Sequence, residues 1–142
     1  MTVALGVVAL LLGSVGLAGQ LISVLDFELA QRLGLQEKDG GTDPLFRHLE
    51  LNTARWDLFV LWTLPLAGIG MLIDATWWPW AALIAGGAYV DAGGREVFKL
   101  LALRTEGVPV GTGRETRLGL GFLTLMVAVG IALIVHALVV LS

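Results

Sequence analysis

The first 25 residues, MTVALGVVALLLGSVGLAGQLISVL (residues 1–25), contain no Asp, Glu, Lys or Arg. A membrane-spanning helix needs about 20 mainly apolar residues, whereas the apolar core of a signal peptide has only about 7–15. The run also lacks the positively charged segment that precedes such a core. We therefore expect residues 3–25 to form a retained first transmembrane helix.

The rest of the chain has a similar composition. Of the 142 residues, 56% are hydrophobic and 15% are charged, whereas soluble domains average about 45–50% and about 25%. Three further segments qualify, or nearly qualify, as spans: roughly residues 58–73, 77–101 and 118–141. The sequence predicts an all-α, polytopic integral membrane protein whose four transmembrane helices form one bundle, a single domain over residues 1–142.

The positive charges predict the orientation in the membrane. All nine Lys and Arg residues fall in or beside the first and third connections, roughly residues 26–57 and 102–117. They are Arg32, Lys38, Arg47, Arg55, Arg95, Lys99, Arg104, Arg114 and Arg117. Lys and Arg are enriched in cytoplasmic loops. We expect a cell (inner) membrane location with both termini on the non-cytoplasmic side and TWWPW (residues 76–80) at the outer interface.

Capping signals predict helical extensions on the cytoplasmic side. Asp43 precedes Pro44 as an N-cap, and Thr112 with Glu115 forms a capping-box pattern before the last span. Gly34 is the expected stop of the first helix, which would continue beyond the membrane through DFELAQRL (residues 26–33).

The second span is short. We expect an extension at its N-terminal side through FRHLELNTARWD (residues 46–57) and a kink at Pro65, which lacks a backbone N–H.

Small residues recur at helical spacings in two of the predicted spans. In membranes such faces allow helix backbones to approach closely, and polar side chains such as Gln20 can hydrogen-bond across the contact. Packing within one bundle and packing between subunits both remain open. The candidate packing residues are Gly6, Gly13, Gly16 and Gln20 in the first helix and Gly86, Gly87, Gly93 and Gly94 in the third.

The third span contains the charged stretch GGAYVDAGGREVFK (residues 86–99). Asp91, Arg95 and Lys99 follow at i, i+4 and i+8, so they form one stripe in the favourable order for an ion pair. The long cations can reach the cytoplasmic interface, but a short carboxylate inside a bilayer is costly unless it is paired or wetted. Asp91 is therefore either paired with Arg95 or Arg55, a proton- or cation-binding group in a cavity open to the cytoplasm, or interfacial.

A second charged group precedes the second span, where HLELNTARWD (residues 48–57) supplies acidic, basic and amide side chains. Its members can face the stripe of the third span. A network of mixed sign resembles a structural clasp more than an ion filter, which repeats one sign. The candidate ionic clasp or ion site comprises Asp91, Arg95, Glu96, Arg55 and Asp57.

Several chemistries are disfavoured. The chain has no cysteine and a net charge of −3 without a basic patch, which argues against thiolate chemistry and nucleic-acid binding. His48 and Glu50 are poorly spaced for one metal ion, and His136 is expected near the opposite membrane face from His48. We expect no metal and no cofactor.

The glycine-rich GTGRE (residues 111–115) lacks the lysine of a phosphate-binding loop. A turn with a capping box accounts for it. If this region binds a ligand, a lipid headgroup at Arg114 and Arg117 is the expected one.

These patterns favour a small, non-catalytic integral membrane protein that acts through helix packing, as a homo-oligomer or as an accessory subunit of a membrane complex. Its expected partners are the lipid bilayer and itself or another membrane protein. The alternative is a proton or cation channel or transporter that uses Asp91. A weaker alternative is a lipid-acting membrane enzyme that uses His48, Glu50 and Asp57 as acid and base.

Overall fold

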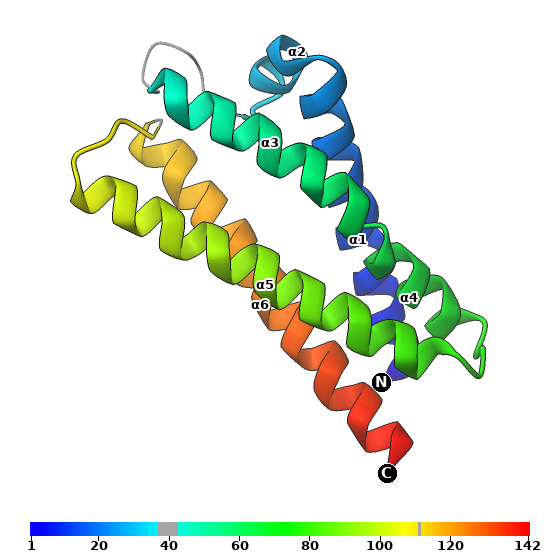
Figure 1. Cartoon of the computed structure of the whole chain (residues 1–142). Helices are drawn as coiled ribbons and strands as arrows, with labels where there is room; N and C mark the ends of the chain where they lie inside the picture. Colours follow the sequence, from blue (N-terminus) through cyan, green and yellow to red (C-terminus); the bar gives the residue numbers. More distant parts are fainter. Residues whose placement is uncertain (37–42, 111) are drawn as a thin grey trace.

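The computed structural model describes residues 1–36, 43–110 and 112–142, and this part of the chain is all-α. Its helices are arranged as Figure 1 shows. They are α1 (Thr2–Leu25), α2 (Phe27–Arg32), α3 (Pro44–Val60), α4 (Thr63–Leu72), α5 (Trp78–Thr105) and α6 (Gly113–Leu141).

The helices associate in two sets. α5 packs along α6, whereas α1 packs against α4 and α3, and α4 also contacts α5. Both chain termini lie at one end of the molecule (Figure 1). At the other end lie α2, the beginning of α3 and the connection between α5 and α6, and here the two sets diverge. This second end is the one for which the sequence predicts a cytoplasmic location.

Both predicted helix starts are confirmed. Asp43 is the N-cap of α3, its carboxylate accepts from the N–H of Leu45 at 2.8 Å, and Pro44 occupies the first position. At the start of α6 the N–H of Glu115 donates to the Thr112 hydroxyl at 3.3 Å. The Glu115 carboxylate accepts from the N–H of Thr112 at 2.7 Å.

The prediction that the first helix continues through DFELAQRL is wrong. α1 ends at Leu25, because Asp26 has an extended backbone (φ −148°, ψ 88°). Its carboxylate accepts from the N–H of Leu29 at 2.9 Å and thereby starts the separate helix α2. Asp26 is itself an N-cap. Gly34 lies beyond the end of α2 with φ +74°, in the left-handed region that favours glycine.

The kink predicted from Pro65 is confirmed and lies one turn earlier in the chain. α3 ends at Val60 and α4 begins at Thr63. Pro65 has no N–H for the carbonyl of Leu61, four residues before it. That carbonyl instead accepts from the hydroxyl of Tyr89 at 3.2 Å and from the N–H of Leu64 at 3.3 Å.

Glycines of α1 lie where α4 approaches most closely. A Cβ on Gly13 would lie 2.5 Å from Cδ of Pro65, and one on Gly6 would lie 2.9 Å from Cβ of Met71. Either distance is too short for a real Cβ, so these two glycines allow the backbones of α1 and α4 to pack together.

The contact between α5 and α6 depends on glycines in the same way. A Cβ on Gly86 would lie 2.7 Å from the carbonyl oxygen of Gly130, and one on Gly93 would lie 2.8 Å from that of Leu123. Gly87 and Gly94 differ, because a Cβ on either would meet nothing within 4 Å. These two glycines are therefore not needed for packing within the described chain.

Two of the described helices, α1 and α6, are long and apolar enough to cross a membrane by length and composition. α4 has ten residues and is too short to do so alone. α5 contains Asp91, Arg95 and Glu96, which lower its apolar character. Neither α4 nor α5 therefore meets the criterion that α1 and α6 meet.

Candidate binding cavity between the helix pairs

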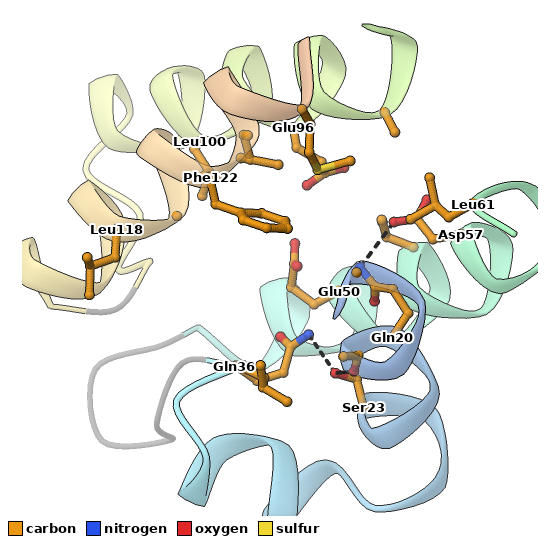
Figure 2. A pocket seen from close by; sticks show the side chains of 18 of the residues that line it. Gln20, Ser23, Gln36, Glu50, Asp57, Leu61, Glu96, Leu100, Leu118 and Phe122 are labelled. Atoms are coloured by element: carbon orange, nitrogen blue, oxygen red, sulfur yellow. Dashed lines mark hydrogen bonds between the residues drawn. The ribbon is translucent and has the colours of Figure 1, made fainter. Parts of the chain in front are cut away.

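A cavity of about 390 Å³ lies between α1, α3, α5 and α6. It occupies the region where the two sets of helices diverge (Figures 1 and 2). Small-molecule sites in proteins have volumes of about 300–1,000 Å³ and combine apolar walls with a few polar groups. The polar residues of this cavity include Gln20, Ser23, Glu50, Thr53, Asp57 and Glu96.

Three of these polar residues share one face of α3. Glu50, Thr53 and Asp57 follow at spacings of three and four, which places them above one another on a helix. Figure 2 shows the Glu50 carboxylate pointing into the cavity. α1 supplies Gln20 and α5 supplies Glu96 from the other walls. The cavity thus gathers acidic groups from helices that are far apart in the sequence.

Asp57 is 5% exposed and is held from two sides. Its carboxylate accepts from Nε2 of Gln20 at 3.2 Å and lies 3.7 Å from the guanidinium of Arg95. Arg95 is also 3.4 Å from Asp91 and 3.8 Å from Glu96. The guanidinium of Arg95 therefore lies within ion-pair distance of three carboxylates.

Lys99 makes a second bridge, one turn farther along α5. Its ammonium nitrogen lies 2.6 Å from Oε1 of Glu50, forms an ion pair with Glu96 and lies 5.6 Å from the centre of the Phe46 ring. Burial raises the pKa of the Glu50 carboxyl above its usual value, although the positive charge of Lys99 opposes this shift.

Four of the five predicted clasp residues lie together in the structure. Arg95 forms ion pairs with the other three, Asp57, Asp91 and Glu96. The prediction that Arg55 joins them is wrong for the described structure, since its guanidinium donates to Oδ1 of Asn52 at 3.2 Å. Two residues along a helix correspond to a rotation of about 200°, so Arg55 and Asp57 face different sides of α3.

Asp91 does not lie in the cavity. Its side chain is 71% exposed, and it is not among the described residues that line the space. Within its own helix it pairs with Arg95.

The sequence predicted neither the ion pair between Lys99 and Glu50 nor the hydrogen bond from Gln20 to Asp57. The spacing of Glu50, Thr53 and Asp57 was a usable signal, because it marks one polar face on α3. The residues that contact this face could not be predicted from the sequence, because they depend on how α1 and α5 are placed around α3.

The remaining candidates lie elsewhere. Arg114 and Arg117 are exposed at the start of α6, and Nε of Arg117 donates to the carbonyl of Gly113 at 3.1 Å. Gly111 of the GTGRE segment lies outside the described residues. The lipid-headgroup site stays a prediction.

The two histidines have different surroundings. His136 is 7% exposed, its Nε2 lies 2.8 Å from the Thr2 hydroxyl, and its ring stacks on Trp78 at 5.3 Å. His48 is exposed on α3. Within residues 1–36, 43–110 and 112–142, no group of three or more His, Cys, Asp or Glu side chains has the arrangement of a metal site.

No protein-family model matches the chain, and neither a curated protein nor a solved structure does.

Proposed function

We propose that the protein is a four-span integral membrane protein that binds a solute in the cavity from the cytoplasmic side and catalyses no reaction. The observation that carries this proposal is the cavity itself. It combines buried carboxylates with apolar walls at the end of the molecule where Lys and Arg are concentrated. Both termini would lie on the non-cytoplasmic side, in agreement with the distribution of positive charge.

The outward-facing apolar surface supports membrane insertion. In the most apolar 18-residue stretch of each helix, only 22% of α1 and 33% of α6 is buried. A core helix of a soluble protein would be mostly buried, so these two helices present apolar side chains to their surroundings. The close packing of Gly6 and Gly13 against α4 supports retention of α1 in the mature protein.

α3, α4 and α5 would supply the other two spans. α4 continues the direction of α3 beyond the kink (Figure 1), so the two together provide the length that α4 lacks. α5 exposes Trp80, Ile84 and Phe98. Its charged residues lie toward the predicted cytoplasmic end, where Arg95 and Lys99 would reach the interface.

A solute-binding role accounts for the buried acidic groups better than packing alone. Carboxylates at membrane depth are costly unless they are paired or wetted. Asp57 and Glu96 are paired with cations and also border a cavity. A clasp that served only to hold helices together would not need such a space beside it.

Cysteine accessibility tests this proposal, because the natural chain contains no cysteine. Thr53→Cys places a thiol on the cavity wall, Thr76→Cys at the predicted outer connection and Ile84→Cys on the exposed apolar face of α5. A charged, membrane-impermeant thiol reagent should label Thr53→Cys only from the cytoplasmic side and Thr76→Cys only from the other side. Ile84→Cys should resist labelling from both sides.

Arg104→Cys, an exposed site near the end of α5, controls for access to the cytoplasmic face. If Arg104→Cys is labelled and Thr53→Cys is not, the cavity is closed to the cytoplasm and the proposal is overturned. Labelling of Thr53→Cys and Thr76→Cys from the same side would overturn the topology.

A second candidate is association with a copy of the chain or with another membrane protein. It is favoured by Gly87 and Gly94, which stay open on α5 while Gly86 and Gly93 are used against α6. Two alternatives have less support. A proton or cation conductor based on Asp91 would use a carboxylate outside the cavity, and a lipid-acting enzyme would need His48, which is exposed, beside the buried Asp57.

A further inference from the structure

Acidic groups outnumber basic ones among the described residues that line the cavity. The acidic ones are Glu50, Asp57, Glu96 and Glu115, and no Lys or Arg is among these described residues. Arg95 and Lys99 pair with Glu50, Asp57 and Glu96 from outside this lining. A cleft with an excess of one sign and low-dielectric walls attracts ligands of the opposite charge.

The amide of Gln20 adds a further acceptor to this lining. Its orientation follows from its bond to Asp57, because a carboxylate can only accept and the NH₂ group must therefore face it. Oε1 of Gln20 is buried and has no hydrogen-bond partner among the described residues. A buried acceptor without a donor costs free energy, and a ligand with N–H groups would remove that cost.

Apolar side chains line the rest of the cavity. They include Leu61, Leu100, Leu118, Phe122 and Met126. Figure 2 shows Phe122 across the cavity from Asp57 and close to the direction in which Glu50 points. A hydrated metal ion would gain nothing from these side chains, whereas a hydrocarbon or aromatic body would be removed from water against them. An aromatic ring also attracts an organic cation through its face.

We propose that the cavity binds an organic cation with an apolar body, such as a substituted ammonium. Its head would lie on the wall formed by Glu50, Asp57, Glu96 and the Gln20 amide, and its body would lie on Leu100, Phe122 and Met126. This inference rests on the proposed solute-binding function and specifies its ligand class. An anionic ligand is disfavoured because it would meet the same carboxylates, and no Lys or Arg is among the described residues of the cavity wall.

Binding of matched small molecules to the purified protein tests this inference. The probes are 4-phenylbutylammonium, the neutral 4-phenylbutanol and the anionic 4-phenylbutyrate, added to the full chain in nanodiscs of uncharged lipid and measured by equilibrium dialysis. The ammonium should bind saturably, and it should bind at least about tenfold more tightly than the alcohol. Equal binding of the alcohol or the carboxylate would overturn the inference.

Variants locate the site. Glu50→Gln should weaken binding of the ammonium by about tenfold or more, whereas Asp91→Asn, outside the cavity, should leave it unchanged. Phe122→Ala keeps every ion pair described above and should also weaken binding of the ammonium, which keeps the test valid if Glu50→Gln does not fold. An equal effect of Asp91→Asn and Glu50→Gln would indicate a surface effect and overturn the inference.

The two proposals can fail separately. If the thiol at position 53 is reached from the cytoplasm but the ammonium does not bind saturably, the ligand class is wrong and the solute-binding function stands. If that thiol is not reached, the function itself fails.

Discussion

At the scale of single residues, the hydroxyl of Tyr89 compensates for the N–H that Pro65 lacks. It donates to the carbonyl of Leu61 at 3.2 Å, beneath the cavity. Tyr89→Phe leaves this carbonyl with only the N–H of Leu64 at 3.3 Å, so it should lower the free energy of unfolding by about 0.5–1.5 kcal/mol. Thermal unfolding in a mild detergent measures the loss.

Thr124→Val is the matched control for Tyr89→Phe. It also deletes a hydroxyl that donates to a carbonyl, that of Leu120 at 2.7 Å, but this bond is exposed, whereas the bond of Tyr89 is buried. Its effect should be much smaller. Equal losses for the two variants would show that the Tyr89 bond has no special part in the kink.

The Glu50 carboxyl predicts how stability depends on pH. Its pKa in the folded protein lies above 4.5, its usual value, because burial disfavours the charged form. The folded state therefore holds this proton more tightly than the unfolded state. Its contribution to stability is fully present below pH 4.5 and is lost as the pH rises through the raised pKa.

As the pH falls from neutral toward 4.5, the melting temperature of the wild type should rise relative to that of Glu50→Gln. Differential scanning fluorimetry of both proteins across this range measures the difference. A difference that stays constant, or that moves in favour of Glu50→Gln, would contradict the raised pKa.

At the scale of helices, two glycines give opposite predictions. A Cβ on Gly13 would lie 2.5 Å from Cδ of Pro65, whereas one on Gly87 would meet nothing within 4 Å. Gly13→Ala should destabilise the protein by about 1–3 kcal/mol through overpacking between α1 and α4. Gly87→Ala should stabilise it by about 0.5–1 kcal/mol, because alanine is the better helix former.

Unfolding by sodium dodecyl sulfate, followed by circular dichroism, compares these two variants with the wild type. A loss of stability in Gly87→Ala would mean that position 87 is covered by something outside the described chain. Such a result would favour the second candidate function, association through α5.

The helix ends were largely predictable from the sequence. Asp43, Thr112 and Glu115 act through neighbours within three residues, so their roles can be read locally. Asp26 was missed because it also belongs to a run with helical periodicity, and its capping role competes with that pattern. The existence of the kink followed from Pro65, but its position at Leu61 and the partner Tyr89 did not.

At the scale of the whole molecule, the sequence predicted the charged cluster and offered a cavity at Asp91 as one alternative, but it did not predict the cavity at Glu50 and Asp57. Asp91, Arg95 and Glu96 share one helix, so their proximity is local. The cavity arises because α1 and α3 diverge from α5 and α6 at one end (Figure 1). That divergence depends on contacts between distant helices, which helical periodicity does not contain. For this reason the sequence pointed to Asp91 as the candidate ion-binding carboxylate, whereas in the structure Glu50 and Asp57 line the cavity.

The hydrogen bond between Thr2 and His136 has a consequence for the connectivity of the chain. It holds the beginning of α1 beside the end of α6, so the termini are neighbours in space (Figure 1). The order of the helices is therefore almost cyclic. A short peptide linker between the two termini would close the ring without moving a helix. The ring could then be opened at Asp74, between α4 and α5, and each helix would keep the neighbours it has now.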